Sequence, residues 1–217
     1  MNSIPCLNVV VLISGEGTNL QTLIDAERTG KINTKIRAVF SDKFGVPGIE
    51  RAHRADIPAH ALAQTDFPNR AAYEKELANR IDSYEPGLIV LAGFMKILGA
   101  DFVDHFRGRI INIHPSLLPR YRGLDTHRRV LEAGDKKHGA TVHFVTERLD
   151  NGPRIIQYRV SIRPNESEAK LTQRVHTGEY IILPRAVAWV ADQRLRLDGM
   201  NVMLDDRRLE TPVLVED

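Results

Sequence analysis

Short apolar runs alternate with amphipathic stretches through the first half of the chain. Five of these runs predict β-strands, namely Leu7 to Ile13, Ile36 to Phe40, Ala59 to Leu62, Leu88 to Ala92 and Arg109 to Ile113. Runs that are apolar throughout are typical of strands buried on both faces, as in parallel sheets covered by helices. We therefore expect an α/β fold with a Rossmann-like open, mostly parallel sheet and helices on both faces.

The stretches between these runs predict the helices. The clearest is Asn69 to Tyr84, where Tyr73, Leu77 and Ile81 recur every four residues and therefore fall on one face. Shorter helices are predicted at Leu20 to Glu27, opened by Thr18 or Asn19, at Ala100 to Phe106 and at His127 to Ala133.

The second half of the chain is less regular. Strands are predicted at Thr141 to Val145 and Ile155 to Val160, joined by the turn-like Asp150 to Pro153, with weak strands around Leu195 and Leu204 and a turn at Asp198-Gly199. The stretch Glu166 to Val190 predicts a long helix interrupted near Pro184, because proline removes a helical hydrogen bond. No repeat, low-complexity segment or linker is evident, so we expect one domain.

Parallel sheets of this kind bind ligands at the carboxyl ends of their strands, here after Ile13, Ala92 and Ile113. The loop Ser14-Gly15-Glu16-Gly17-Thr18-Asn19 follows the first strand and opens a helix. Its glycines allow close approach of the backbone, and the helix N-terminus offers free N–H groups, so phosphate is the natural ligand. The loop matches neither a P-loop nor the dinucleotide fingerprint. A tight turn with an ordinary N-cap explains it equally well.

Composition limits the classes of partner. The 217 residues are 42% hydrophobic and carry a net charge of only +2, with arginines scattered along the chain, so we expect no nucleic-acid partner. No apolar stretch is long enough to cross a bilayer, and Met1 to Pro5 carries no positive side chain, so we expect a cytoplasmic protein without a secretory signal. Eight histidines and the single Cys6 show no spacing typical of metal ligands, so no metal is expected.

A specific set of motifs appears in the middle of the chain. The run Asn112-Ile113-His114-Pro115-Ser116-Leu117-Leu118-Pro119 is followed by Gly123, by Gly139-Ala140-Thr141-Val142-His143 and by Asp150-Asn151-Gly152-Pro153. With the loop Ser14 to Asn19 and the segment Ala92-Gly93-Phe94-Met95, this series resembles the folate-dependent formyltransferases. The resemblance covers the chain up to a tail that begins after about Leu195. The phosphate loop and the lack of room for an added domain favour the branch that acts on a ribonucleotide.

The resemblance implies transfer of the formyl group of 10-formyltetrahydrofolate, a co-substrate, to the amine of 5-phosphoribosylglycinamide in purine biosynthesis. It also implies one formyltransferase domain over residues 1–217. The N-terminal half would bind the phosphate and ribonucleotide, and the C-terminal half would bind folate and carry the catalysis. The expected partners are small molecules, without nucleic acid or membrane, and the expected state is a monomer or weak homodimer.

Three catalytic residues follow from the resemblance: Asn112, His114 and Asp150. The amide N–H of Asn112 and a protonated His114 can stabilise the oxyanion that forms when the amine attacks the formyl carbon. His114 can also give a proton to the departing folate nitrogen, and Asp150 would favour the charged imidazole and help to pass a proton. Taken alone, Asp150 can also be an ordinary turn residue.

Binding residues are carried over in the same way. Gly17, Thr18, Asn19 and Glu179 would bind the ribonucleotide, whereas Arg70, Met95, Lys96, Ile97, Leu98 and Asn112 would bind the folate. Apolar side chains of the segment Met95 to Leu98 would enclose the flat ring. Core packing explains that segment as well, and Arg70 and Glu179 can also be solvent-exposed helical residues.

The sequence departs from the family pattern at Glu16, Arg122 and Asp125, which stand where Asn, Pro and His are expected. The carboxylate of Asp125 can tune His114 or Asp150 if it lies near them. Two alternatives remain open. One is another enzyme of the superfamily that formylates a different amine or hydrolyses formyl-folate. The other is a non-catalytic nucleotide-binding module, which explains the glycine loop but not Asn112, His114 and Asp150 together.

Overall fold

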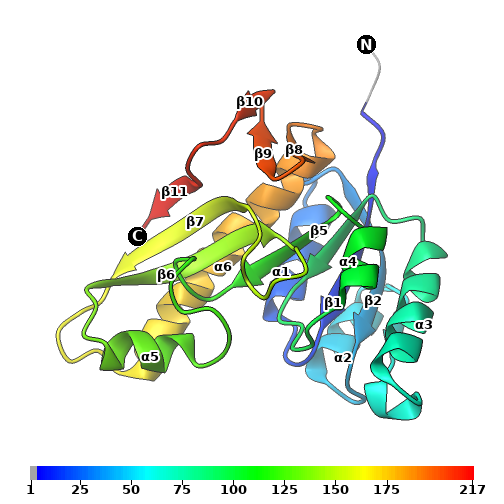
Figure 1. The fold of residues 1–217 in the computed structure, drawn as a ribbon, viewed down its shortest axis with the longest axis horizontal. Helices are drawn as coiled ribbons and strands as arrows, with labels where there is room; N and C mark the ends of the chain where they lie inside the picture. The colour runs from blue at the N-terminus through cyan, green and yellow to red at the C-terminus, as the bar shows by residue number, and fades with distance from the viewer. Residues whose placement is uncertain (1–3) are drawn as a thin grey trace.

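A twisted eight-stranded sheet runs through the molecule (Figure 1). The computed structural model describes residues 4–217, so the first three residues of the segment considered for a secretory signal lie outside it. The strands are β1 (Leu7–Ile13), β2 (Thr34–Ser41), β3 (Ala59–Ala61), β4 (Leu88–Leu91), β5 (Ile110–His114), β6 (Lys137–Phe144), β7 (Arg154–Ser161) and β11 (Val213–Glu216). Their order across the sheet is β11-β7-β6-β5-β4-β1-β2-β3.

The sheet is parallel from β3 to β5 and antiparallel from β5 to β7. The strands β3, β2, β1, β4 and β5 pair in parallel, whereas β5 pairs with β6 and β6 with β7 in the antiparallel sense. At the far edge, β11 pairs in parallel with β7. The prediction of a mostly parallel sheet is therefore confirmed, and the antiparallel pair β5–β6 brings residues distant in sequence face to face.

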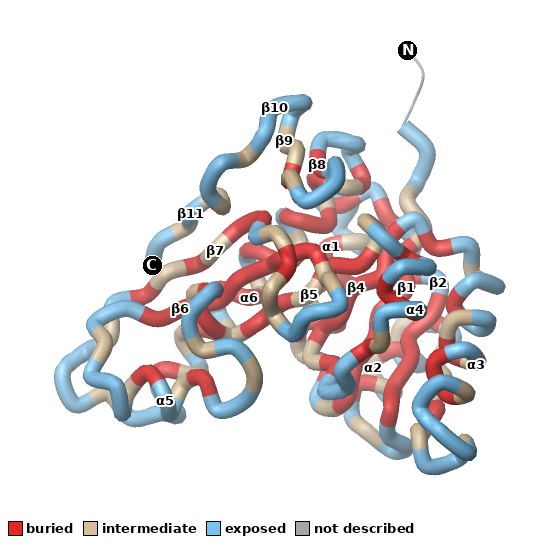
Figure 2. The backbone as a smooth tube through the Cα atoms, in the orientation of Figure 1, coloured by how far each residue is buried: buried red, intermediate tan, exposed pale blue. Residues whose placement is uncertain are grey.

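Helices cover both faces of the sheet, as predicted. They are α1 (Thr18–Arg28), α2 (Pro47–Arg54), α3 (Arg70–Asp82), α4 (Ala100–His105), α5 (Thr126–Glu132) and α6 (Glu168–Ala191). Alternate residues of β1 face opposite sides: Val9 and Val11 pack in the core that α1 and α6 cover, and Val10 packs in the core that α3 and α4 cover. Figure 2 shows the sheet buried between exposed outer surfaces.

One local prediction is wrong, and one helix was not predicted. Helix α6 continues through Pro184 rather than breaking there, because Ile182, Leu183 and Ala186 on the same stretch are fully buried against the sheet. Helix α2 was not predicted, although Pro47 occupies its first turn, a position that favours proline.

The tail forms a small sheet of its own. The strands β8 (Leu195–Asp198) and β9 (Asn201–Leu204) confirm the predicted weak strands and the turn between them, and the short β10 (Arg207–Arg208) pairs with β9. The strands β10 and β11 were not predicted. Within residues 4–217, no helix is both long and apolar enough to span a membrane.

Candidate active site

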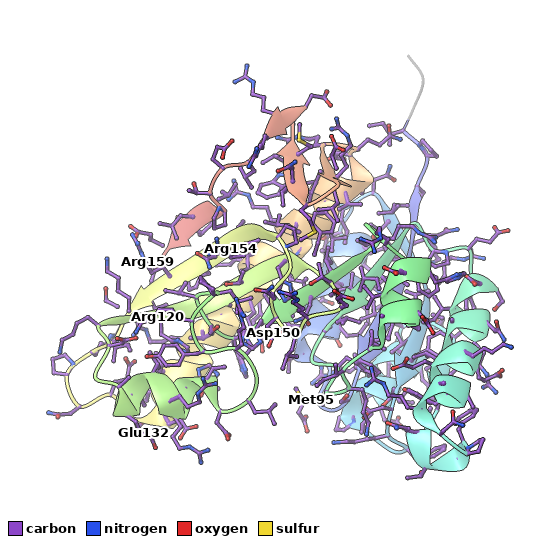
Figure 3. The ribbon with its side chains drawn as sticks, in the orientation of Figure 1. Met95, Arg120, Glu132, Asp150, Arg154 and Arg159 are labelled. Atoms are coloured by element: carbon purple, nitrogen blue, oxygen red, sulfur yellow. The ribbon has the colours of Figure 1, made fainter. Side chains whose placement is uncertain are left out.

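A cavity of about 620 Å³ opens at the carboxyl ends of β1, β4 and β5. The residues that line it come from the loops after these strands, from the turn before β7 and from α6, and they include Gly17, Met95, His114, Asp150 and Glu179. In Figure 3, Met95 and Asp150 are labelled among the segments that contribute to it. The cavity therefore joins the glycine loop and the Asn112–His114–Asp150 group at one edge of the sheet.

The glycine loop is held against the start of α2. Gly17 has φ 68°, and a Cβ atom built on it would lie only 2.6 Å from Cα of Gly48. The N–H of Gly48 donates to the carbonyl of Gly15 over 3.0 Å. Gly17 is also the N-cap of α1, and no side chain caps that helix, so neither Thr18 nor Asn19 caps it as predicted. The first N–H groups of α1 are therefore left for a ligand.

Asn19 and Glu179 meet although 160 positions separate them. The amide of Asn19 donates to Oε2 of Glu179 over 2.8 Å, and both residues are buried. Burial raises the pKa of Glu179, which the bond from Asn19 partly opposes. The other amide atom, Oδ1 of Asn19, is buried and has no hydrogen-bond partner among the described residues. Two residues predicted for the ribonucleotide thus form one polar patch on the cavity wall.

His114 and Asp150 form a buried pair. Nδ1 of His114 lies 3.4 Å from Oδ2 of Asp150, and each side chain is only 7% exposed. The other ring nitrogen, Nε2, lies 2.9 Å from the carbonyl of Tyr121. Both neighbours are acceptors, so a doubly protonated imidazole can donate to each. The backbone N–H of Gly123 donates to Oδ2 of Asp150 over 2.9 Å and fixes the carboxylate.

Asn112 faces His143, a histidine to which sequence analysis assigned no role. Nδ2 of Asn112 lies 3.1 Å from Nε2 of His143, and Oδ1 of Asp150 lies 3.8 Å from the same nitrogen. The signal for this contact was the antiparallel register, in which Asn112 and His143 are direct partners across β5 and β6. That register is not visible in a sequence read strand by strand.

The residues predicted for folate divide into three groups. Met95 and Ile97 are largely exposed at the cavity mouth, and the N–H of Met95 donates to Oγ of Ser14. Lys96, Ile97, Leu98 and Asn112 line a narrower adjoining cavity of about 70 Å³ that also reaches Asp150. Arg70 lines neither cavity: its guanidinium pairs with Glu74, which accepts the N–H of Gly99.

The three departures from the family pattern lie outside the catalytic contacts. The carboxylate of Asp125 forms an ion pair of 2.6 Å with Arg128 and is 58% exposed, rather than bonding to His114 or Asp150. Glu16 is exposed, and its carbonyl accepts a bond from Arg51. The carbonyl of Arg122 accepts a bond from Arg129.

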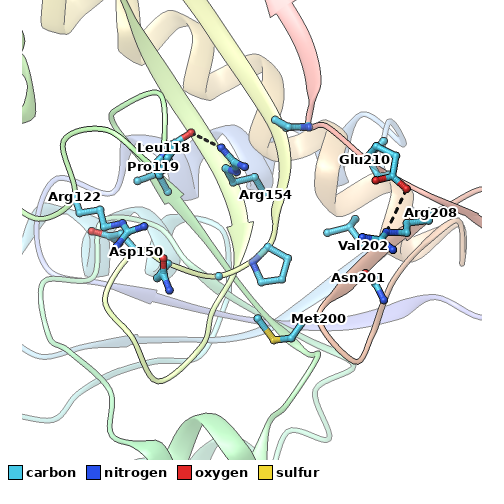
Figure 4. Close-up of a pocket in the computed structure, with 15 residues that line it drawn as sticks. Leu118, Pro119, Arg122, Asp150, Arg154, Met200, Asn201, Val202, Arg208 and Glu210 are labelled. Atoms are coloured by element: carbon cyan, nitrogen blue, oxygen red, sulfur yellow. Dashed lines mark hydrogen bonds and ion pairs between the residues drawn. The ribbon is translucent and has the colours of Figure 1, made fainter.

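A separate cavity of about 420 Å³ reaches Asp150 from the side of the tail (Figure 4). It is lined by Arg122, Arg154 and Arg208 among others. Arg154 donates to the carbonyl of Leu118 over 2.9 Å, and Arg208 pairs with Glu210 at 3.3 Å. Two of the three arginines are thus engaged by the protein itself. No cluster of three or more metal-ligating side chains occurs in residues 4–217.

Comparison with known proteins gives matches along almost the whole chain. The family described as "Formyl transferase" matches residues 7–187. The chain is 51% identical to phosphoribosylglycinamide formyltransferase of Escherichia coli strain K12, over 94% of this chain and 96% of that protein. The Haemophilus influenzae protein of the same name is 44% identical, over 93% and 95%. The solved structure of phosphoribosylglycinamide formyltransferase from Coxiella burnetii superposes with a TM-score of 0.93 at 49% identity, covering 97% of this chain and 99% of that one.

Proposed function

The chain belongs to the formyl transferase family, and we propose that it transfers the formyl group of 10-formyltetrahydrofolate to the amine of 5-phosphoribosylglycinamide in purine biosynthesis. The observation that carries the proposal is the cavity that joins an uncapped, glycine-opened helix N-terminus to Asn112 and the buried His114–Asp150 pair. Such a cavity can hold a phosphate at one end and present an amine at the other. High sequence identity to relatives named phosphoribosylglycinamide formyltransferase supports this choice of substrate.

In this proposal the acceptor lies along the glycine loop. The N–H groups at the start of α1 bind its phosphate, where the helix dipole favours negative charge. Glu179 and the unpartnered Oδ1 of Asn19 accept bonds from hydroxyl or amine hydrogens of the ligand. Gly17, Thr18, Asn19 and Glu179 thereby hold the ribonucleotide with its amine directed to His114.

The ring end of the folate enters the adjoining narrow cavity. Its flat ring packs among Ile97, Leu98 and their neighbours, and its formyl group reaches Asn112, which lines both cavities. Met95 and Lys96 line the wall of the larger cavity beside it. Arg70 acts from further away, because its ion pair with Glu74 holds the N–H of Gly99 and so anchors the end of this segment.

The chemical step then follows from the buried pair. The amine nitrogen forms a bond to the formyl carbon, and the carbonyl oxygen becomes an oxyanion that Asn112 and protonated His114 stabilise, at about 3 kcal/mol for each well-placed donor. The bond from the formyl carbon to N10 of the folate breaks as the oxyanion returns its electrons. The amine loses a proton and N10 gains one, with Asp150 and His114 as the carriers.

The proposed partners are the two small-molecule substrates, without nucleic acid, membrane or metal. The small net charge of +2 supports the absence of an extended nucleic-acid surface. We propose a cytoplasmic protein that is a monomer or weak homodimer, and sedimentation over a range of concentrations measures that state.

The acceptor assay tests the function. Formyl transfer from 10-formyltetrahydrofolate, followed by the change in folate absorbance, is expected with the ribonucleotide and to persist at moderate salt. Binding of many phosphates on a duplex loses affinity with a slope of about −0.9 per phosphate, whereas one phosphate at a helix end gives a shallow dependence. Little transfer is expected to the riboside that lacks the phosphate, and none to charged initiator tRNA.

The outcomes separate the alternatives. Equal rates with the riboside and the ribonucleotide would mean that the glycine loop does not bind phosphate. Faster transfer to tRNA would identify a different acceptor, and release of formate without any acceptor would identify a hydrolase. Absence of all three reactions would leave a non-catalytic nucleotide-binding module.

A further inference from the structure

We propose that His143 is a positioning residue that fixes the orientation of the Asn112 side-chain amide and so presents an N–H of that amide to the formyl oxygen. This inference rests on the proposed function, because it deepens the role given to Asn112. His143 itself does not contact the substrates in this proposal. Its action is exerted through the amide that it faces.

The sheet register places the two side chains together. Asn112 on β5 and His143 on β6 are direct partners in an antiparallel pair. Side chains at such positions project from the same face with Cβ atoms about 4.5–5.5 Å apart. The next pair on that face is His114 with Thr141, so the catalytic histidine and the amide share one face of the sheet.

Hydrogen bonding fixes the tautomer of His143. Its Nδ1 lies 2.8 Å from the carbonyl of Phe144, which can only accept, so Nδ1 carries a hydrogen. Burial lowers the pKa of His143 to about 4, because the charged ring would be desolvated. At neutral pH the ring therefore has one N–H, at Nδ1, and a lone pair at Nε2.

This lone pair selects one orientation of the amide. The atom of Asn112 that faces Nε2 at 3.1 Å must be a donor, hence the NH₂ group. A flipped amide would set Oδ1 against the lone pair and leave a buried acceptor without a partner, which is costly. With the NH₂ group held in place, one of its hydrogens is bound to His143. The second is available to the cavities that Asn112 lines.

The same turn holds both His143 and Asp150. Gly152 lies so close to β6 that a Cβ atom built on it would be 1.7 Å from the carbonyl of Phe144, the acceptor of His143. The carbonyl of Pro153 accepts the N–H of Phe144 over 2.9 Å. The turn that supplies Asp150 is therefore fastened to the backbone that sets the tautomer of His143, which ties the carboxylate and the amide to one support.

The test compares two substitutions of His143, one that removes the hydrogen-bond acceptor and one that keeps it. His143→Leu removes the acceptor and is expected to lower kcat by about ten- to a hundredfold, part of the ~10²–10³ that loss of an oxyanion donor costs. KM for both substrates should change less than about twofold, because ground-state binding does not use this N–H. His143→Gln can accept from Asn112 and donate to Phe144, and should recover most of the lost kcat.

A double substitution separates positioning from a structural role. In an Asn112→Ala background, His143→Leu should cause no further loss of kcat, because there is no amide left to orient. A further loss equal to that in the wild-type background would overturn the proposal. A folded His143→Gln protein as slow as His143→Leu would also overturn it.

A measurement that does not use activity keeps the inference independent of the reaction. Side-chain ¹⁵N spectra of the wild-type protein should show a neutral His143 with its hydrogen on Nδ1. They should also show that the Asn112 NH₂ group donates a hydrogen bond to Nε2 of His143. A hydrogen on Nε2 at neutral pH would overturn the inference even if His143→Leu fails to fold. If the spectra agree but no formyl transfer occurs, the proposed function fails and the orientation of the amide stands.

Discussion

Backbone groups hold His114 and Asp150, which are proposed to act on the formyl group, and His143, which is proposed to position Asn112. The carbonyl of Tyr121 holds His114, the N–H of Gly123 holds Asp150 and the carbonyl of Phe144 holds His143. A backbone partner costs no side-chain entropy to position, so the geometry is set by the fold itself. A substitution at these residues should therefore affect the chemistry more than the stability.

His114→Ala and Asp150→Asn are each expected to lower kcat by about a hundredfold or more, within the ~10²–10⁴ typical of acid–base catalysis. Steady-state rates with saturating substrates measure the effect. The chain offers a matched control in His105 and Asp82, an exposed histidine–carboxylate pair at 2.7 Å. His105→Ala and Asp82→Asn should leave kcat nearly unchanged. A near-normal rate for either cavity variant would remove that residue from the catalytic set.

Sequence reasoning named the proposed catalytic residues, which lie in the motifs, and missed the positioning residue His143, which depends on strand pairing. Asn112, His114 and Asp150 could be named because the motifs that carry the family resemblance contain them, and the structure brings all three to one cavity. The role of His143 depends on its register opposite Asn112. The ion pair of Asp125 with Arg128 was also missed, although the two residues are three positions apart at the start of α5, a spacing that allows such a pair.

At the scale of elements, the strands with long apolar runs were predicted correctly. Local sequence rules failed where the packing of buried side chains outweighs them. A proline inside a helix costs about 3 kcal/mol or more. Burial of one large apolar side chain contributes about 1.5–3 kcal/mol, so Ile182 and Leu183 with their buried neighbours keep α6 continuous through Pro184. Helix α2 buries only the small residues Gly48 and Ala52, and β11 is a four-residue strand at the sheet edge beside β7, so neither presents a long apolar run.

The junction of β1, α1 and α2 gives a prediction at this scale. Gly17 has a positive φ, and its Cβ position is blocked by Gly48, so Gly17→Ala should lower the free energy of unfolding by about 1–3 kcal/mol. Gly15 has no heavy atom within 4 Å of its Cβ position, so Gly15→Ala should fold normally. Urea unfolding measures both.

Gly15→Ala then isolates the role of the loop in binding. Its methyl group would occupy space where the backbone meets the phosphate, so KM for the ribonucleotide should rise several-fold more than KM for the folate. Equal changes in the two KM values would contradict a phosphate site at this loop. A loss of stability as large as that of Gly17→Ala would show that the loop tolerates no side chain for packing reasons.

Across the described residues, the buried His138 and His143 and the half-buried His127 are neutral at neutral pH in the folded state. Burial lowers the pKa of His127 to about 4, of His138 to about 3 and of His143 to about 4. Nδ1 of His127 lies 3.0 Å from Nε2 of His138, so one ring must donate and the other accept. Protonation of both rings would remove this bond and place two charges in the interior.

The lowered pKa values of these histidines predict a loss of stability in mild acid. Below the unfolded pKa of about 6.5 the unfolded chain binds protons that the folded chain excludes until about pH 4, so the free energy of unfolding should fall as pH falls through this window. The slope is about 1.4 kcal/mol per pH unit for each fully excluded proton. Urea unfolding between pH 7.5 and 5, above the range where most carboxylates titrate, measures this slope.

His138→Gln should make the slope shallower, whereas His53→Gln, at an exposed position, should leave it unchanged. Constant stability across this range would mean that the buried rings accept protons without cost.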